Sequence, residues 1–432
     1  MSGRFSFSKI SVVGLGYIGL PTAALFASCK KQVIGLDINQ NIVDVVNQGK
    51  IHISEPGLEA IVRDVVSDGY LTATCIPECA DVFVIAVPTP FKSDHQPDLS
   101  YIQSAASAIA PVLKAGNLVI LESTSPVGAT EQLEIWLATA RPDLSFPSLR
   151  GEHSDIRMAY CPERVLPGKV LHELIENDRI IGGMTILCSD MAIAFYQLFV
   201  KGTCVATTTR TAEMCKLTEN SFRDVNLAFA NEISMICDKL DIDEFELIRL
   251  ANRHPRVNIL QPGIGVGGHC IPVDPWFIVS SAPEHAKLIA AARDVNDSKP
   301  EWFLDKVQAS ITAFLEDNPE KLKKDITIAC FGLAFKPDID DLRESPALYI
   351  VQKLGALYNG PILIVEPNIN TLPASLMKIA NLTDAESALA ESDIILLLVN
   401  HSSFKDLPIQ KMLSSEKKYK LIDMRGSSNK TT

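Results

Sequence analysis

A glycine-rich turn near the start of the chain constrains its fold more than any other segment. The β-branched run at residues 10–13 is followed directly by Gly14-Leu15-Gly16-Tyr17-Ile18-Gly19, which fits the pattern G-x-G-x-x-G. An apolar stretch typical of a helix comes next, and Asp37 closes a second β-branched run eighteen residues after Gly19. A strand, a glycine turn, a helix and an acidic residue in this order are typical of a dinucleotide-binding β-α-β unit.

This turn also predicts which cofactor is bound. The glycines allow the backbone to approach a pyrophosphate, and the positive end of the following helix favours its charge. Asp37 can accept hydrogen bonds from ribose hydroxyls and would repel a 2′-phosphate, so we expect NAD rather than NADP. The alternative is a tight strand–helix turn that binds no ligand.

Three threonines follow later strands of the same unit. Thr89 comes after the apolar run at 82–87, Thr124 after the run at 118–121, and Thr130 begins the next helical stretch. Ligands bind at the carboxyl ends of parallel strands, so these residues are candidate cofactor contacts. By spacing alone, ordinary turn and helix-cap roles are equally good explanations.

Alternating strands and helices appear at both ends of the chain. We therefore expect an α/β protein with two Rossmann-like, doubly wound parallel-sheet domains joined by a helical central segment. The expected parts are residues 1–205, 206–320 and 321–432. The helical stretches of the central part are expected at 211–240, 243–252, 283–292 and 301–314, and the strands of the last part at 326–331, 362–365, 394–399 and 419–422.

Composition excludes several classes of function. The formal net charge of -12 argues against nucleic acid or an anionic membrane as a partner. The apolar run at 394–399 is far shorter than the ~20 residues that span a bilayer. The ten cysteines have no metal-ligand spacing, so we expect no metal and read them as reduced thiols of a cytoplasmic protein.

The most unusual segment runs from Gly263 to Pro275 and contains Cys270. Four glycines precede this cysteine, and Pro272 and Pro275 follow it, so the loop can press close to a ligand. A thiol in such a loop is exposed enough to react, whereas most cysteines are buried and inert. Asp274 lies four residues on and can orient water or the thiol. A structural glycine-rich loop with an incidental cysteine is an equally good reading of the spacing.

Several other clusters carry polar side chains. Lys216, Asn220 and Arg223 share one face of a predicted helix, although such faces are usually just solvated. Two loops combine cations with turn residues, and further basic residues lie upstream of the cysteine segment. These clusters are residues 161–168, residues 331–345, and the pair His254 and Arg256. Several local cations in an acidic protein would suit a diphosphate ligand.

Taken together, these motifs resemble the UDP-glucose/UDP-mannose dehydrogenase family. The match runs nearly end to end, and its motifs are GLGYIG, EST, CPERVLPG, TAEMCKLTEN, GVGGHC and FGLAFKPDIDDLRES, in that order. The segments CPERVLPG and ANRHPRVNILQPGIGVGGHC are most similar to the bacterial branch that oxidises UDP-N-acetyl-D-mannosamine. Ile264 and Pro272 are the positions at which we expect this chain to depart from the pattern of its relatives.

The resemblance implies a role for each candidate residue. Cys270 is the nucleophile, Lys216 and Asn220 stabilise the oxyanion, Asp274 assists proton transfer, and Glu163 activates water for thioester hydrolysis. It also implies an NAD domain, a helical segment that forms a homodimer, and a domain that holds UDP. Residues implied to line the substrate site are Arg164, Val165, Arg223, His254, Arg256, Gly267, Phe335 and Lys336, and Arg343 is implied to reach the cofactor.

The expected reaction is oxidation of a UDP-sugar at C6 to the acid, with two NAD per sugar and a covalent cysteine intermediate. Within the family, UDP-glucose and UDP-N-acetylglucosamine are the alternative substrates. A two-electron hydroxy-acid dehydrogenase is a rival of another reaction class, but it would need neither Cys270 nor the third domain. A non-catalytic NAD-binding regulator is a further rival, and it would be expected to lack catalytic residues.

Overall fold

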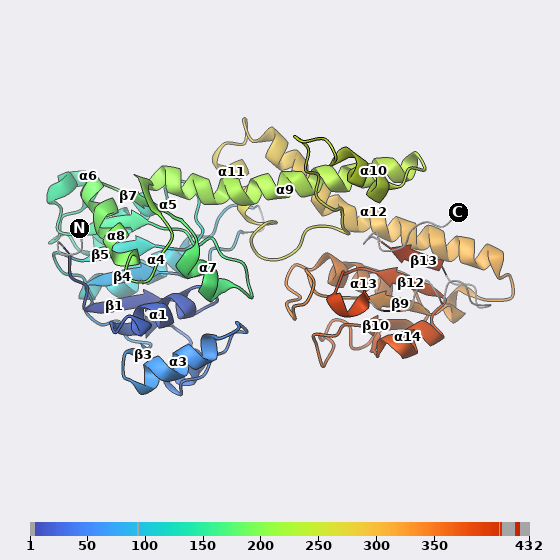
Figure 1. The fold of residues 1–432 in the computed structure, drawn as a ribbon, viewed down its shortest axis with the longest axis horizontal. Helices are drawn as coiled ribbons and strands as arrows, with labels where there is room; N and C mark the ends of the chain where they lie inside the picture. Colours follow the sequence, from blue (N-terminus) through green and yellow to red (C-terminus); the bar gives the residue numbers. More distant parts are fainter. Residues whose placement is uncertain (1–4, 93–94, 406, 408–419, 424–432) are drawn as a thin grey trace. The chain divides into compact units, whose positions relative to one another are not determined.

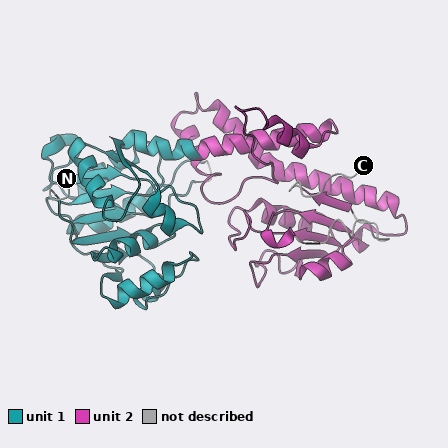
Figure 2. Ribbon diagram, in the orientation of Figure 1, with its two compact units in different colours: residues 1–219 teal, residues 220–432 magenta. Residues whose placement is uncertain are grey.

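The computed structural model describes residues 5–92, 95–405, 407 and 420–423. The chain divides into two compact units, residues 1–219 and residues 220–432 (Figure 2). Helix α9 (Thr209–Lys239) begins in the first unit and ends in the second. None of the helices in these described ranges has both the length and the apolar character that crossing a bilayer requires.

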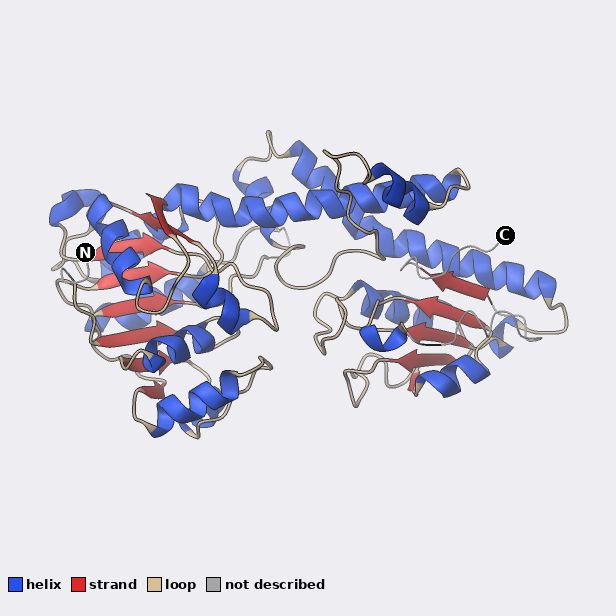
Figure 3. Ribbon diagram, viewed as in Figure 1, coloured by secondary structure: helices blue, strands red, loops and turns tan. Residues whose placement is uncertain are grey.

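The first unit is built on an eight-stranded sheet with the order β3-β2-β1-β4-β5-β6-β7-β8 (Figures 1 and 3). Neighbouring strands are parallel except β6 and β7, which are antiparallel. The strands are β1 (Lys9–Val13), β2 (Gln32–Leu36), β3 (Leu71–Thr74), β4 (Val82–Ile85), β5 (Leu118–Leu121), β6 (Arg157–Tyr160), β7 (Arg179–Gly183) and β8 (Cys204–Thr208).

Both faces of this sheet are buried, which explains its continuous apolar strands. In β4, Val82 and Val84 join one apolar cluster, while Phe83 and Ile85 join another on the opposite face. Helices α1, α2, α3 and α8 contribute to the first cluster, and α4 and α5 to the second. The helices are α1 (Gly19–Ser28), α2 (Gln40–Asn47), α3 (Leu58–Ser67), α4 (Ser100–Ile109), α5 (Ala129–Ala140), α6 (Pro147–Arg150), α7 (Val170–Glu176) and α8 (Ile186–Tyr196), with 3-10 turns at Ala110–Val112 and Gly151–His153.

The second unit contains a smaller sheet with the order β11-β10-β9-β12-β13, and all of its neighbouring strands are parallel. This order repeats the arrangement of the first five strands of the first unit. The strands are β9 (Ile328–Phe331), β10 (Ile362–Val365), β11 (Asn381–Leu382), β12 (Ile394–Leu397) and β13 (Lys420–Asp423). Its helices are α10 (Glu244–Ala251), α11 (Asp274–Ser281), α12 (Lys287–Asp317), α13 (Pro346–Leu357) and α14 (Ala385–Glu391), with 3-10 turns at Lys323–Asp325 and Ser402–Phe404.

The predicted fold class is confirmed, with differences in detail. The sequence indicated four strands in the first sheet, but β3, β6, β7 and β8 also belong to it, and β8 continues past residue 205 to Thr208. Two separate helices were expected at 283–292 and 301–314, and this was wrong. One helix, α12, runs through Pro300, because apolar side chains on both sides of the proline, including Ala292 and Phe303, are buried.

Ser345 and Pro346 begin helix α13 (Pro346–Leu357). The Ser345 hydroxyl oxygen accepts a hydrogen bond from the Leu348 N–H at 3.3 Å, and Pro346 is the first helical residue. The expected strand at 419–422 appears as β13, while Tyr419 itself lies outside the described residues.

Candidate active site

The surroundings of the three glycines in the first turn differ. Gly14 has a φ of +90°, and a Cβ there would lie 2.6 Å from the Ala86 carbonyl oxygen. A Cβ on Gly19 would lie 1.8 Å from the Gly14 carbonyl oxygen. A Cβ on Gly16 would meet no atom within 4 Å. Gly14 and Gly19 therefore shape the turn, while Gly16 leaves open space beside the first turn of α1.

Asp37 lies directly after β2 and contacts this turn. One carboxylate oxygen accepts from the Leu15 N–H at 2.9 Å, and the other accepts from the Asn39 N–H at 2.9 Å. The side chain remains partly exposed, as do Tyr17 and Ile18 in the turn. The carboxylate is thus fixed in direction and still accessible, as a ribose acceptor requires.

His52, which the sequence did not single out, belongs to the same region. Partial burial lowers the pKa of this imidazole, while the Asp37 carboxylate and the Leu15 backbone act in the opposite direction. A histidine outside any motif offers no sequence signal for this placement.

The three threonines have unlike surroundings. The Thr89 hydroxyl donates to the Thr124 carbonyl oxygen, so the structure brings together the segments that follow β4 and β5. Thr130 is fully buried, and both its hydroxyl and its N–H donate to the Glu213 carboxylate, at 2.7 and 2.9 Å. Its hydroxyl is therefore committed to the start of α5 and is not presented to a ligand.

A buried ion pair joins Glu163 and Lys216. The Lys216 Nζ donates to one Glu163 oxygen at 3.0 Å, and the Val165 N–H donates to the other at 2.9 Å. The two side chains are only 11% and 7% exposed. Glu163 lies in the loop after β6 and Lys216 on α9, so residues 53 apart in sequence form one charged contact. The neighbouring Arg164 pairs with Glu219 at 2.7 Å and remains partly exposed.

A second buried carboxylate, Glu122, lies in the same unit and interacts electrostatically with Glu163. Burial raises the pKa of Glu122, while Arg179 and the Tyr196 hydroxyl oppose this rise. The Arg179 guanidinium lies 3.2 Å from its carboxylate and 4.5 Å from the Tyr196 ring centroid. No role was predicted for Glu122, although a charged residue directly after the buried strand β5 was a usable signal.

In the second unit, Cys270, Asp274 and Asn220 lie together. The Cys270 carbonyl accepts from the Asp274 N–H at 2.9 Å, at the start of α11. The Asn220 amide donates to the Asp274 carboxylate at 2.5 Å. Asp274 is 3% exposed, whereas Cys270 is partly exposed.

Cys270 is partly exposed, as are Cys29, Cys204 and Cys215, whereas four other cysteines are buried. Cys161 and Cys330 are fully buried, and burial raises their pKa values to about 11 and about 12. Thiols of this kind are unreactive, because the thiolate is the nucleophilic form. The partial exposure of Cys270 agrees with the reactive reading of the glycine loop, but exposure alone does not single out this cysteine.

The glycines before Cys270 are packed against Phe335. A Cβ on Gly268 would lie 2.8 Å from the Phe335 ring, and a Cβ on Gly267 would lie 2.8 Å from the Phe335 Cβ. Lys336 follows, with its Nζ 5.9 Å from the Phe335 ring centroid. The structure thus brings together Gly267, Phe335 and Lys336, which the sequence predicted from separate motifs.

The remaining candidates are on the surface of the second unit. Arg343 is exposed, and its guanidinium contacts both oxygens of Asp341, at 2.6 and 2.9 Å. Arg223, His254 and Arg256 are exposed, and the Arg256 N–H donates to the His254 Nδ1 at 3.3 Å. Within the described part of the chain, no three histidine, cysteine or acidic side chains are grouped as metal ligands.

Comparison with known sequences assigns the family. Three sequence profiles match the chain in order: the "NAD binding domain" of the UDP-glucose/GDP-mannose dehydrogenase family at residues 8–200, its "central domain" at 210–298 and its "UDP binding domain" at 329–430. The chain belongs to this family. The resemblance seen in the sequence is confirmed, except that the family's mannose substrate carries GDP and not UDP.

Relatives cover almost the whole chain. The NDP-N-acetyl-D-galactosaminuronic acid dehydrogenase of Ralstonia nicotianae is 61% identical over 97% of this chain and 96% of its own length. The UDP-N-acetyl-D-mannosamine dehydrogenase of Yersinia pestis is 59% identical over 98% of this chain and 99% of its own. The structure of the UDP-D-ManNAc dehydrogenase from Pyrococcus horikoshii is similar with a TM-score of 0.86, at 37% identity over 98% and 96% of the two chains.

Proposed function

We propose that this protein oxidises UDP-N-acetyl-D-mannosamine at C6 to UDP-N-acetyl-D-mannosaminuronate, using two NAD per sugar and a covalent intermediate on Cys270. The family, the end-to-end relatives and the partly exposed Cys270 beside Asp274 support this proposal. The observation that carries it is the contact set of Cys270, Asp274 and Asn220. It brings the loop that carries the candidate nucleophile and the Asp274 carboxylate together with an amide donor from α9.

NAD, when bound, accepts the hydride removed from C6 in each of the two oxidations. Residues that fit this cofactor are Gly14, Gly16, Tyr17, Ile18, Gly19 and Asp37, with Thr89 and Thr124 at the neighbouring strand ends. The open space at Gly16 and the partly exposed Asp37 carboxylate are the features that suit a dinucleotide. Arg343 remains a proposed contact, and Thr130 acts indirectly through the first turn of α5.

The chemistry assigned to the chain begins after the first oxidation, which leaves an aldehyde. The Cys270 thiolate adds to the C6 carbonyl carbon and gives a thiohemiacetal, whose oxygen carries the negative charge before it is protonated. Loss of a second hydride from C6 gives a thioester. Water then adds to the thioester carbonyl, the C–S bond breaks, and the sugar leaves as a carboxylate while Cys270 recovers its thiol.

The proposal assigns the neighbouring residues to these steps. Asn220 and Lys216, one turn apart on α9, donate hydrogen bonds to the oxyanion, and losing one such donor typically costs ~10²–10³ in rate. Asp274 takes up protons released at C6. Glu163 activates water for thioester hydrolysis, and its ion pair with Lys216 keeps its carboxylate directed. The residues proposed to hold the UDP-sugar are Arg164, Val165, Arg223, His254, Arg256, Gly267, Phe335 and Lys336.

A substrate panel tests the proposal. Purified protein with limiting UDP-N-acetylmannosamine and excess NAD is expected to form two NADH per sugar, with little from UDP-glucose or UDP-N-acetylglucosamine. UDP-N-acetylgalactosamine belongs in the panel, because the name of the Ralstonia relative points to a galacto configuration at equal identity. One NADH per sugar would contradict the covalent intermediate. Two NADH from another sugar would keep the mechanism and change the substrate.

We also infer a homodimer formed through the central helices. Phe222, Phe229 and Ile236 recur on α9 at a spacing of seven, and Leu240 directly follows the helix; they are 71, 49, 46 and 61% exposed. Residues at these spacings share one face of a helix, and an exposed apolar stripe of this kind is typical of a subunit interface. Light scattering after gel filtration should give twice the chain mass, and Phe229→Asp should lower it toward one chain.

The proposed organisation has an NAD domain at 1–205, a helical segment at 206–320 and a UDP-sugar domain at 321–432. We place the enzyme in the bacterial cytoplasm, where NAD and nucleotide sugars are supplied. Its acidic sugar product is suited to surface polysaccharide synthesis.

A further inference from the structure

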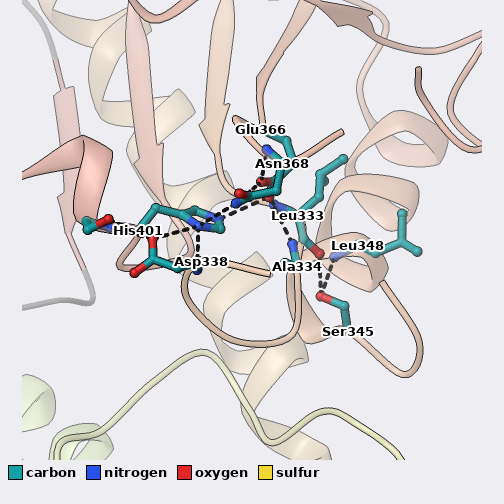
Figure 4. Close-up of polar contacts among 9 residues, drawn as sticks. Leu333, Ala334, Asp338, Ser345, Leu348, Glu366, Asn368 and His401 are labelled. Atoms are coloured by element: carbon teal, nitrogen blue, oxygen red, sulfur yellow. Dashed lines mark hydrogen bonds and ion pairs between the residues drawn. The ribbon is translucent and has the colours of Figure 1, made fainter. Parts of the chain in front are cut away.

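A buried histidine–carboxylate pair lies at the carboxyl end of the second sheet. Glu366 directly follows β10, and His401 lies in the segment after β12; they are 4% and 0% exposed. The His401 Nε2 is 3.1 Å from a Glu366 oxygen (Figure 4). Neither residue is among the predicted site residues, but both bind backbone groups of a neighbouring loop.

The hydrogen bonds around His401 assign its tautomer. Its Nδ1 accepts from the Asp338 N–H at 2.9 Å and lies 3.2 Å from the Asn368 amide nitrogen, which is also a donor. Nδ1 therefore carries no proton, and Nε2 carries the proton donated to Glu366. The ring joins a backbone N–H on one side to a carboxylate on the other, so its orientation is fixed.

The same pair holds both ends of one loop. Glu366 accepts from the N–H groups of Leu333 and Ala334, at 2.7 and 3.1 Å, while His401 accepts from the N–H of Asp338. Asp338 has a φ of +61°, and its carboxylate accepts from the Ser402 N–H and hydroxyl, at 2.8 and 2.9 Å. The segment 333–338 is thus fastened at its start and at its end by adjacent groups (Figure 4).

Phe335 and Lys336 lie between these two attachments. Phe335 packs on Gly267 through its Cβ and on Gly268 through its ring, and Gly268 lies two residues before Cys270. A shift of the segment 333–338 would therefore move two proposed substrate contacts and release the chain that leads to the nucleophile.

We propose that His401 and Glu366 are positioning residues that set the affinity for the uridine diphosphate part of the substrate by fixing the segment 333–338. Neither residue touches the substrate; both act through Phe335 and Lys336. This inference rests on the proposed function in one respect only, namely that these two residues contact UDP.

The test is UDP binding by calorimetry, with UDP itself as the probe, using the full chain saturated with NAD. His401→Asn keeps an acceptor near the Nδ1 position but loses the donor to Glu366. The Kd for UDP should therefore rise about tenfold, which is the loss of affinity expected for one hydrogen bond. The KM for the UDP-sugar should rise in parallel, and the KM for NAD should stay unchanged. His401→Gln, which retains a donor near Nε2, should recover part of the affinity.

Tyr358→Phe is the matched control. Its hydroxyl is a partly buried donor to the Lys323 and Ile326 carbonyls, before the start of β9 and so at the other end of the same sheet. This variant should lose stability but keep the wild-type Kd for UDP. If His401→Asn shows the same behaviour, a lower melting temperature with unchanged UDP affinity, the positioning role is wrong.

Ser402→Ala covers the case in which His401→Asn does not fold. Ser402 is exposed, and the substitution removes only one hydrogen bond to Asp338. We expect a two- to fivefold rise in the Kd for UDP, about 1 kcal/mol or less at 1.4 kcal/mol per factor of ten. An unchanged Kd in this variant would overturn the proposal. If the wild type binds UDP but oxidises a different UDP-sugar, the proposed substrate is wrong, while the UDP comparison still decides the role of His401.

Discussion

The Nζ of Lys216 lies 3.0 Å from the Glu163 carboxylate, and both side chains are almost completely removed from solvent. Each partner holds the other in place, because an unpaired charge in the protein interior has a high free-energy cost. The pair holds the Glu163 carboxylate in one direction, in a loop that otherwise has little regular structure.

Glu163→Gln should stop the reaction at the thioester. The amide retains the shape of the side chain but cannot accept a proton from water, so turnover should fall by ~10²–10⁴. Intact-protein mass spectrometry after mixing with UDP-N-acetylmannosamine and NAD should then detect the sugar acid attached to the protein. Cys270→Ala is the control and should show no adduct. Turnover at the wild-type rate would exclude Glu163 as the base.

Cys270→Ser should separate the two oxidations. A hydroxyl is a much weaker nucleophile than a thiolate, so the variant should stall after the first hydride or release product very slowly. The NADH formed per limiting sugar should approach one, where the wild type gives two. Complete four-electron turnover by the serine variant would remove the covalent step.

The first two glycines of the amino-terminal turn form a matched pair for the cofactor. Gly16→Ala adds a Cβ into open space, so the melting temperature should stay within about 2 °C while the KM for NAD rises. Gly14→Ala adds a Cβ 2.6 Å from a carbonyl oxygen at a φ of +90°, and should cost about 1–3 kcal/mol in the free energy of unfolding. An unchanged KM for NAD in Gly16→Ala would place the cofactor elsewhere.

Glu366 should make stability depend on pH in the acid range. Burial alone would raise its pKa, but hydrogen bonds from His401, Leu333 and Asn368 lower it to about 2, from 4.5. Between these values the unfolded chain binds more protons, so this contribution, about 3 kcal/mol, is complete above pH 4.5 and is lost as the pH falls toward 2.

Urea unfolding of the wild type and Glu366→Gln between pH 6 and pH 3 measures this dependence. The difference in unfolding free energy between the two proteins should shrink as the pH falls. A constant difference would mean that the charge of Glu366 does not contribute to folding.

Much of the fold could be predicted because its central strands are buried on both faces. Such strands are short apolar runs followed by turn residues, and β1, β2, β4, β5, β10 and β12 stand out in this way. Strand β8 has mostly polar or small residues and lies at the sheet edge, so its pattern is weak. Helix α12 was divided in the prediction because Pro300 normally ends a helix, and only tertiary packing reveals that it does not.

The site could be predicted motif by motif but not contact by contact. The glycines, Asp37 and Cys270 lie in recognisable local motifs. The contact between Lys216 and Glu163 joins segments 53 residues apart, and no sequence pattern indicates that these segments are neighbours. Glu366 was missed, although it follows β10 in the second sheet as Asp37 follows β2 in the first. Asp37 accepts a hydrogen bond from the N–H of Leu15, two residues after β1, and Glu366 accepts the equivalent bond from the N–H of Leu333, two residues after β9. Its partner His401 carries no motif, so this half of the pair had no usable signal.

The burial of Glu366 also limits how many cofactors one chain can take up. Asp37 keeps part of its carboxylate accessible, while the corresponding carboxylate of the second sheet is enclosed by His401 and Asn368. At this position the described part of the chain has an accessible carboxylate in the first sheet and an enclosed one in the second. Excess NAD should saturate the protein at one equivalent per chain and should not compete with the nucleotide sugar, so a high cellular NAD level would drive the oxidation without inhibiting it.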